Sequence, residues 1–290
     1  MFSTAGKADR CLYHSAGGRW NRGAFTGAGV LRRDPPDRYV FNYRASYAEE
    51  TAAIVHYLLT VRGVKPDEIA VFAQQDGYGK AGFSGVAKAL RKAGFDAKRI
   101  VRVGYARNSM DLDAAVNGLL AHKAQIKAVV MVPTYRQAAV FVKRVRDQGL
   151  NPIFTSVSFV DSNAFAEALR ELGPKYADGV IVTQVVPFFG SGATGVLEYR
   201  ERLARYFPAE QPGFVSLEGY IVARVLCAGL EKAGPDLTTE RLVEALETIR
   251  GLDFGIGTKI SFGPSEHQAS HKVWAVTLDS KGHFQNLELD

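Results

Sequence analysis

The sequence of 290 residues contains only two cysteines, Cys11 and Cys227. Two cysteines are too few for a disulfide scaffold or a structural zinc site. We expect a buried, inert thiol at Cys227, inside a helix, and leave open whether the two cysteines pair. No apolar run is long enough to cross a bilayer. The first 23 residues also lack the continuous apolar core that is typical of a secretory signal.

The sequence has little excess charge of either sign. Lys plus Arg number 36 and Asp plus Glu number 30, which gives a formal net charge of +6. The basic residues are spread along the chain, which is typical of a solvated surface rather than a nucleic-acid footprint. We therefore expect no nucleic-acid partner. With 47% hydrophobic residues, 29 glycines and 11 prolines, the chain has the composition of a globular protein with one large domain or two lobes.

Short β-rich runs alternate with amphipathic stretches from Tyr39 onward, whereas residues 1–22 show no regular period. The pattern predicts strands at 39–43, 68–74, 99–103, 126–132, 152–156 and 179–184, and helices at 48–62, 81–93, 111–122, 136–148, 163–172, 195–206, 216–233 and 238–249. The last forty residues predict β structure at 259–262, 273–278 and 284–289. Because parallel strands need crossover helices, this order predicts an α/β fold with parallel sheets and helices on both faces.

Residues Gly77–Gly82 (GYGKAG) match the spacing of a dinucleotide-binding loop. However, Asp76 would meet the pyrophosphate, and the strand at 99–103 is followed by no acidic residue that could hold a ribose. A glycine-rich loop between a strand and a helix is therefore favoured, and we expect no cofactor. A phosphate-binding P-loop motif is not present in the sequence.

Two further groups of residues invite a chemical interpretation. His267 and His271 have a spacing that a metal could use, but no further ligands stand nearby, so we expect a polar loop and no metal site. Glu49 and Glu50 begin the helix at 48–62, where the helix dipole favours acidic residues. These acids need no catalytic role.

Small, polar and aromatic residues gather where predicted strands end. They are Thr26-Gly27-Ala28, Asp76-Gly77-Tyr78, Thr134-Tyr135 and Ser156–Ser158. In open α/β sheets ligands bind at the carboxyl ends of the strands. This set offers hydroxyls, backbone amides and aromatic faces but no nucleophile–base pair. It indicates binding rather than catalysis, so we expect a protein that is not an enzyme.

Five segments, in this order, resemble the type I periplasmic binding proteins, and most closely the branched-chain amino-acid (Leu/Ile/Val) binding branch. They are residues 39–51, 68–90, 129–139, 154–163 and 262–274. The resemblance implies two Rossmann-like lobes joined by hinge crossovers near Tyr43–Ser46, Ser156–Val160 and Gly257–Ser261. Lobe 1 would comprise residues 1–45 and 158–258, and lobe 2 residues 46–157 and 259–290. Family members have a longer first lobe, so we expect an N-terminally truncated product with an incomplete first lobe.

The resemblance also implies a ligand site. The loop Thr26-Gly27-Ala28 would offer amides and a hydroxyl to the ligand carboxylate, and Tyr78 and Tyr135 would close over the ligand from the other lobe. Amino-acid binders carry an acid for the ligand's ammonium where this chain has Ser158. A lone hydroxyl is a poor partner for a desolvated ammonium. We therefore expect a carboxylate or amide ligand rather than a standard amino-acid zwitterion.

The function that follows is the solute-binding component of an ABC-type importer. It would capture a small amino-acid-like, amide or carboxylate ligand between its lobes by hinge closure. Its partners would be that ligand and a membrane permease, and we expect a monomer. The alternatives are a ligand-sensing domain of a signalling receptor and an NADP-dependent enzyme that uses Gly77–Gly82. The resemblance implies a periplasmic location, although a truncated or unprocessed product would remain in the cytoplasm.

Overall fold

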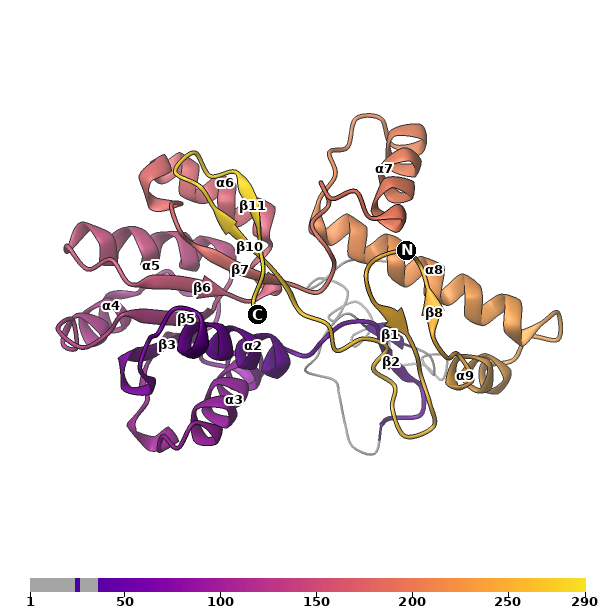
Figure 1. Ribbon diagram of the computed structural model, residues 1–290, viewed down its shortest axis with the longest axis horizontal. Helices are drawn as coiled ribbons and strands as arrows, with labels where there is room; N and C mark the ends of the chain where they lie inside the picture. The colour runs from indigo at the N-terminus through magenta and orange to yellow at the C-terminus, as the bar shows by residue number, and fades with distance from the viewer. Residues whose placement is uncertain (1–23, 27–35) are drawn as a thin grey trace. The chain divides into compact units, whose positions relative to one another are not determined.

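The computed structural model describes residues 24–26 and 36–290, and the chain divides into two compact units (Figure 1). Unit 1 comprises residues 1–46 and 185–272, and unit 2 comprises residues 47–184 and 273–290. Both units are thus built from separate stretches of the chain. The α/β fold that the sequence predicts is confirmed, and its seven-stranded sheet is mainly parallel.

The chain passes between the units at 46–47, 184–185 and 272–273. The first passage lies beside the expected crossover at Tyr43–Ser46. The second differs from the expected position near Ser156–Val160, because the strand Ile181–Gln184 still pairs with the strand Ile153–Ser156 inside unit 2. The third differs from Gly257–Ser261, because Lys259–Ile260 pairs with Leu252–Asp253 inside unit 1.

Unit 2 is built on a seven-stranded sheet with the order β11-β10-β7-β6-β5-β3-β4. Its strands are β3 (Ile69–Gln74), β4 (Val101–Tyr105), β5 (Ala128–Val132), β6 (Ile153–Ser156), β7 (Ile181–Gln184), β10 (Trp274–Leu278) and β11 (Phe284–Leu287). Neighbours among β4, β3, β5, β6 and β7 are parallel. The returning chain adds β10 and β11 antiparallel at one edge, so this sheet is mixed rather than wholly parallel. A short turn suffices between antiparallel neighbours, whereas each parallel pair needs a crossover.

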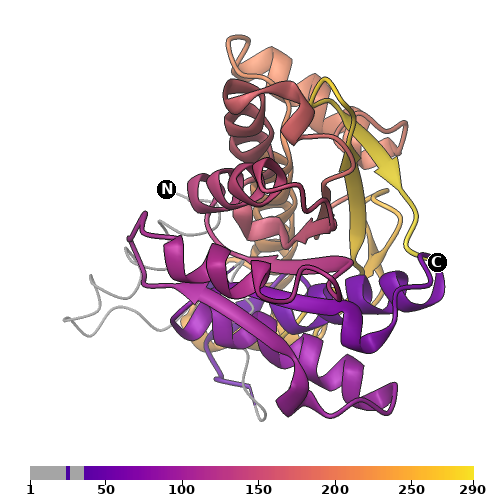
Figure 2. The same cartoon turned by 90° about the vertical axis from the view of Figure 1, so that its left-hand side faces the viewer.

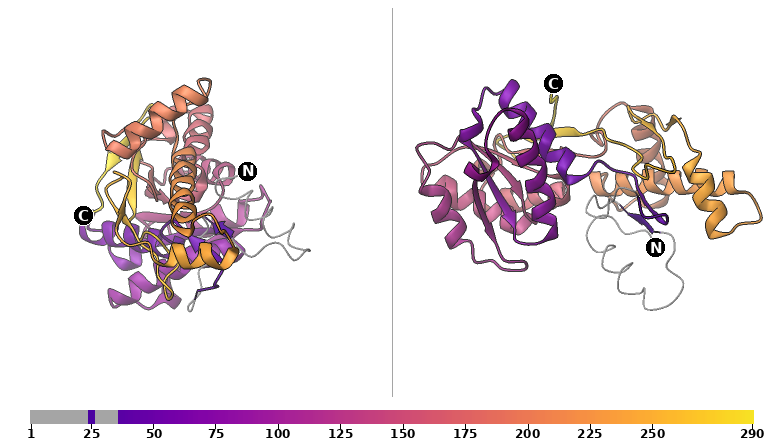
Figure 3. Two further views of the ribbon diagram at one scale, coloured as in Figure 1. Left: turned by 90° about the vertical axis from the view of Figure 1, so that its right-hand side faces the viewer. Right: turned by 90° about the horizontal axis from the view of Figure 1, so that it is seen from below.

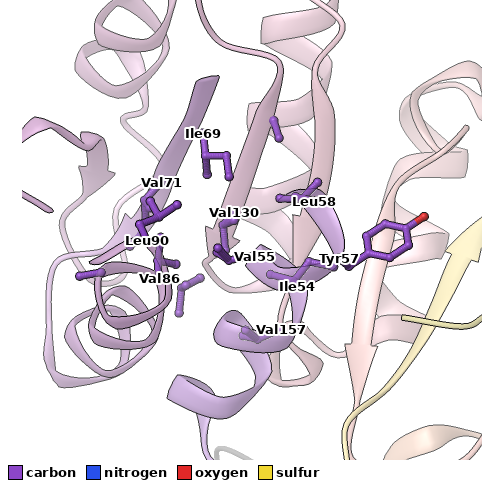
Figure 4. Close-up of a cluster of buried hydrophobic side chains, with 14 of the residues drawn as sticks. Ile54, Val55, Tyr57, Leu58, Ile69, Val71, Val86, Leu90, Val130 and Val157 are labelled. Carbon is purple, nitrogen blue, oxygen red and sulfur yellow. The ribbon is translucent and has the colours of Figure 1, made fainter. Parts of the chain in front are cut away.

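Helices cover both faces of this sheet (Figure 2). They are α2 (Tyr47–Thr60), α3 (Gly77–Lys92), α4 (Asp113–Leu120), α5 (Tyr135–Asp147) and α6 (Ser162–Leu172), with 3-10 turns η3 (Pro66–Glu68), η4 (Ala97–Arg99), η5 (Ser158–Val160) and η6 (Pro174–Tyr176). Strand β3 shows how two faces are filled, since neighbouring side chains point to opposite sides. Val71 joins the cluster under α2 and α3 (Figure 4). Phe72 instead stacks on Phe141 of α5, with ring centroids 3.8 Å apart.

Helix α3 packs closely on its neighbours through glycines. A Cβ atom on Gly85 would lie 2.1 Å from the Ala48 carbonyl oxygen and 2.3 Å from the Thr51 hydroxyl of α2. The Thr51 hydroxyl also donates to the Gly82 carbonyl at 2.8 Å. Only a residue without a side chain allows α2 and α3 to approach this closely.

We expect Gly85→Ala to lower the free energy of unfolding by roughly 1–3 kcal/mol, because backbone cannot move aside for a methyl group in a packed interface. Gly77→Ala is the matched control in the same helix, since a Cβ there meets nothing within 4 Å. It should leave stability unchanged or raise it by about 0.5 kcal/mol through reduced unfolded-state entropy. Urea denaturation of both variants checks this, and equal effects would contradict the close approach of α2 and α3.

Unit 1 contains the strands β1 (Ala24–Thr26), β2 (Val40–Asn42), β8 (Leu252–Asp253) and β9 (Lys259–Ile260), and the helices α7 (Thr194–Tyr206), α8 (Phe214–Ala233) and α9 (Thr239–Glu247). β1 pairs in parallel with β2, and β8 pairs antiparallel with β9. Helix α8 contacts α9, and both are orange in Figure 3. Within the described ranges, no helix has the length and hydropathy that a membrane span requires.

Helix α8 corrects the expectation for Cys227. The helix buries residues at helical spacing, among them Leu217, Ile221 and Val225. Cys227 falls on another side of the helix and is exposed, so the prediction of a buried thiol is wrong. The run from 214 to 233 is apolar over much of its circumference, which is why the sequence did not distinguish its faces.

Buried polar side chains join β2 to the chain that follows β7. The Tyr43 hydroxyl is buried and donates to the Val185 carbonyl at 3.1 Å. The neighbouring Arg44 guanidinium lies 3.5 Å from the Glu218 carboxylate of α8, and both side chains are buried. Burial raises the pKa of the Tyr43 hydroxyl well above its ordinary value, and the nearby Glu218 carboxylate acts in the same direction.

We expect the contribution of Tyr43 to stability to depend on pH. A pKa that is raised in the folded state favours folding fully below the unfolded pKa of about 10, and this contribution falls as the pH rises above it. Tyr43→Phe loses the hydrogen bond and should be less stable than wild type by about 1 kcal/mol at pH 8. By pH 11 wild type should lose about 1.4 kcal/mol that the variant does not lose, so the difference should vanish and slightly reverse. Urea denaturation at both pH values measures it; a constant difference would refute the assignment.

Candidate functional site

Three of the predicted site residues lie where parallel strands of unit 2 end. Tyr78 follows β3 in the first turn of α3, Tyr135 follows β5 as the first residue of α5, and Ser158 follows β6 at the start of η5. The carboxyl ends of parallel strands lie at one edge of a sheet, where ligands of α/β proteins bind. We call this the strand-end edge of unit 2.

The expected carboxylate loop belongs to the other compact unit. Thr26 is the last residue of β1, and its backbone lies opposite Asn42 of β2. Gly27 and Ala28 lie outside the described residues. The role of Thr26-Gly27-Ala28 therefore stays a prediction.

Tyr78 ties the loops of the strand-end edge together. Its hydroxyl donates to the Pro133 carbonyl, directly after β5, at 3.2 Å. Its ring lies 4.8 Å from the Phe159 ring in η5 and 4.9 Å from the Tyr47 ring of α2, measured between centroids. Only 9% of the surface of Tyr78 is exposed. Its main role is therefore to hold the loops of this edge in place through these contacts.

A second set of hydrogen bonds fixes the loop that carries Tyr135. The Thr134 amide donates to the Tyr105 hydroxyl at 3.0 Å, and this hydroxyl donates to the Gln74 side-chain oxygen at 3.2 Å. Burial raises the pKa of Tyr105, although the hydrogen bond from Thr134 opposes the shift. Tyr135 itself is half-buried, and its hydroxyl accepts from Arg136 Nε at 3.1 Å. The backbone thus holds the position of Tyr135, and Arg136 Cζ lies over its ring, 5.6 Å from the centroid.

The glycine motif forms the beginning of α3 rather than the loop that we expected before it. α3 begins at Gly77, and the Asp76 carboxylate caps it by accepting from the Gly79 amide at 3.1 Å. A Cβ on Gly79 would lie 1.8 Å from the Gln74 carbonyl oxygen, and one on Gly82 would lie 2.6 Å from Val132. These glycines allow α3 to pack closely on its neighbours. The Asp76 carboxylate accepts the hydrogen bond of the Gly79 amide, which a bound pyrophosphate would need.

Ser158 is held by a buried carboxylate on α2. The Ser158 amide donates to Glu50 Oε2 at 2.8 Å, and the Ser158 hydroxyl donates to Glu50 Oε1 at 3.0 Å. The Thr183 hydroxyl of β7 donates to Glu50 Oε2 at 2.6 Å. Glu50 is fully buried, while Ser158 is half-buried. The sequence indicated only a helix-dipole role for Glu50 and did not predict this network.

A signal for Glu50 does exist in the sequence. Glu50 stands four residues before Ile54 and eight before Leu58, and all three are buried on one side of α2. Residues at this spacing share a helix face. An acid on an apolar face is buried, and buried acids need hydrogen-bond donors.

The histidine pair lies in unit 1, and His267 takes part in its internal packing. His267 is buried, stacks on Phe41 with centroids 4.0 Å apart, and has Nε2 3.1 Å from the Glu247 carboxylate. His271 Nδ1 lies 2.8 Å from Gln268 Nε2. Over the described ranges, no group of three His, Cys, Asp or Glu side chains could hold a metal ion.

Unit 1 also has a pocket of about 610 Å³ between α7 and α8. Its lining mixes aromatic and charged side chains, including Tyr199, Tyr206, Tyr220, Arg202, Arg224 and Glu198. Arg224 and Glu198 form an ion pair at 2.8 Å. The predicted site residues do not line this pocket.

Comparison with solved structures shows close similarity over most of the chain. A possible leucine/isoleucine/valine-binding protein from Rhodopirellula baltica SH 1 is 39% identical, with a TM-score of 0.84, over 92% of this chain and 70% of that one. A substrate-binding periplasmic protein from Ralstonia solanacearum is 27% identical, with a TM-score of 0.77, over 90% of this chain and 71% of that one. A comparison with curated proteins found no match.

More distant structures share the fold. A branched-chain amino-acid ABC transporter protein from Thermus thermophilus, solved with bound valine, is 18% identical with a TM-score of 0.75, over 92% of this chain and 71% of that one. The family model described as periplasmic binding protein matches residues 19–283. Members of this family bind solutes and are not enzymes as a class. The chain belongs to the periplasmic binding protein family, in its type I, Leu/Ile/Val-binding-like branch.

Proposed function

We propose that the chain is the solute-binding component of an ABC-type importer and acts outside the cytoplasm. Its ligand is a small amino-acid-like, amide or carboxylate compound, and its partner is a membrane permease. Two observations support this role. The chain belongs to the periplasmic binding protein family, and it is similar to a possible leucine/isoleucine/valine-binding protein from Rhodopirellula baltica.

The observation that carries the proposal is the order of the strand-end edge of unit 2. Tyr78 links the ends of β5 and β6 through the Pro133 carbonyl and the Phe159 ring. Tyr135 and Ser158, which are both half-buried, supply a further aromatic ring and a further hydroxyl at this edge. A pre-formed edge of this kind loses little conformational entropy when a ligand binds.

The arrangement suits binding better than catalysis. The hydroxyls of Tyr78 and Tyr105 donate to a backbone carbonyl and a side-chain amide, and that of Ser158 donates to a carboxylate. None of these three hydroxyls pairs with a histidine in the described hydrogen bonds, as an activated nucleophile would require. The side chains can position a ligand and select it by shape and hydrogen bonding.

We expect a thermal-shift screen of amino acids, amides and small carboxylates to identify ligands. A ligand at about 100 times its Kd stabilises the folded state by about 2.7 kcal/mol, which raises the Tm by several degrees. Tyr135→Ala should weaken that ligand about ten-fold or more, because an aromatic contact is lost. Without ligand its Tm should stay near that of wild type.

Tyr206→Ala is the matched control, because Tyr206 is an exposed tyrosine of unit 1 with 57% of its surface accessible. It should leave ligand affinity unchanged. If all three classes of compound fail to shift the Tm, the proposed function is wrong. If Tyr206→Ala weakens the ligand and Tyr135→Ala does not, the strand-end edge is not the site.

A further inference from the structure

The pocket of about 610 Å³ between α7 and α8 is built from one face of each helix. On α8 its lining residues recur at every fourth position, at Ser216, Tyr220 and Arg224, and residues at this spacing share a helix face. On α7 the same spacing relates Glu198 to Arg202. The volume is that of pockets that hold small molecules.

The wall of this pocket is largely aromatic. Tyr199, Phe207 and Tyr220 line it, and the rings of Tyr199 and Tyr220 lie 5.7 Å apart between centroids. Phe207 has 63% of its surface exposed. Exposed apolar surface that gathers in a pocket is typical of a ligand-binding site. An aromatic wall favours a flat aromatic ligand, which can stack on it.

Hydrogen bonds fix the position of Tyr199 in this wall. Its hydroxyl accepts from the Gly213 amide at 3.1 Å and shares a hydrogen bond with the Ser216 hydroxyl at 2.5 Å. Gly213 is the residue before α8, so Tyr199 of α7 holds the first turn of α8. A pocket whose walls are already fixed loses little conformational entropy when a ligand binds.

The charged groups of the pocket do not balance. Arg224 Nη1 lies 2.8 Å from Glu198 Oε2, and Arg202 Nη2 lies 3.8 Å from Glu198 Oε1. Within the lining that the structure describes, one carboxylate therefore faces two guanidinium groups, which leaves one excess positive charge. The distance from Arg202 exceeds that of a hydrogen bond, and a guanidinium has several N–H donors, so Arg202 can bind a further anion.

The two arginines differ in how firmly they are held. Arg224 Cζ lies 4.4 Å from the Phe254 ring centroid and 5.7 Å from that of Tyr220. The Arg202 side chain is 51% exposed and can turn toward a ligand. Burial raises the pKa of Tyr220, and the Glu198 carboxylate acts in the same direction. The Tyr220 hydroxyl therefore stays protonated near neutral pH and does not repel an anion.

We propose that this pocket binds a small, flat aromatic carboxylate, whose ring lies on the aromatic wall and whose carboxylate pairs with Arg202. The planar fork of an arginine matches a carboxylate through two parallel hydrogen bonds. The pocket lies within unit 1, whereas Tyr78, Tyr135 and Ser158 belong to unit 2. The inference therefore goes beyond the proposed solute-binding function and does not rest on it.

Two probes of the same shape, 2-naphthoate and 2-naphthamide, test the role of charge. In a fluorescence titration, wild type should bind the carboxylate saturably and about ten-fold or more tighter than the neutral amide, because only the carboxylate pairs with a guanidinium. This preference should shrink as salt is added, since salt screens an exposed ion pair. Arg202→Gln should bind 2-naphthoate about ten-fold more weakly and bind 2-naphthamide as wild type does.

Arg200→Gln is the matched control, because Arg200 is an exposed arginine of α7 that is not among the described residues lining the pocket. Both substitutions change the net charge equally, so a general attraction to the chain would affect them alike. Phe207→Ala should weaken both probes several-fold, since an aromatic contact does not depend on the ligand charge. Arg202 and Phe207 are exposed, so both variants should keep the wild-type far-UV CD spectrum.

Three results would overturn the proposal. The first is that 2-naphthoate does not bind wild type saturably, and the second is that Arg200→Gln and Arg202→Gln weaken it equally. The third is that Tyr135→Ala weakens 2-naphthoate as much as Arg202→Gln does, because the probe would then bind at the strand-end edge of unit 2.

Discussion

The burial of the Glu50 carboxylate is the constraint on which the strand-end edge of unit 2 depends. A buried charge is costly unless hydrogen-bond donors surround it. The donors come from two separate parts of the chain, Ser158 after β6 and Thr183 in β7. Helix α2 must therefore lie where β6 and β7 meet, and η5 must turn back toward it. Folding and the presentation of Ser158 are consequences of the same contact.

The packing of α3 completes the edge from the other side. Because Gly79 and Gly82 allow α3 to lie directly on β3 and β5, the helix begins at once after Asp76. Tyr78 is then placed in the first turn, close enough to reach Pro133 and Phe159. A motif that resembles a dinucleotide loop thus serves to position an aromatic side chain.

The spacing of apolar residues predicted nearly every helix and strand of the described chain, because this spacing differs between a helix and a strand. It predicted β10 and β11 as strands but not their antiparallel direction, because strand direction depends on how the chain returns after residue 272. The sequence also placed Tyr78, Tyr135 and Ser158 at strand ends. It missed Glu50 because the partners of a buried acid lie far along the chain, more than a hundred residues away for Ser158. The exposed Cys227 was missed for a related reason, since α8 is apolar on more than one side.

We propose that solute recognition uses the strand-end edge of unit 2, where Glu50 holds Ser158. The most direct test is a titration of ¹⁵N-labelled chain with L-leucine, followed by the amide resonances. Binding at the strand-end edge should give saturable shifts at Ser158, Tyr78 and Tyr135, all with one Kd. Shifts confined to the pocket between α7 and α8, or shifts that do not saturate, would contradict it.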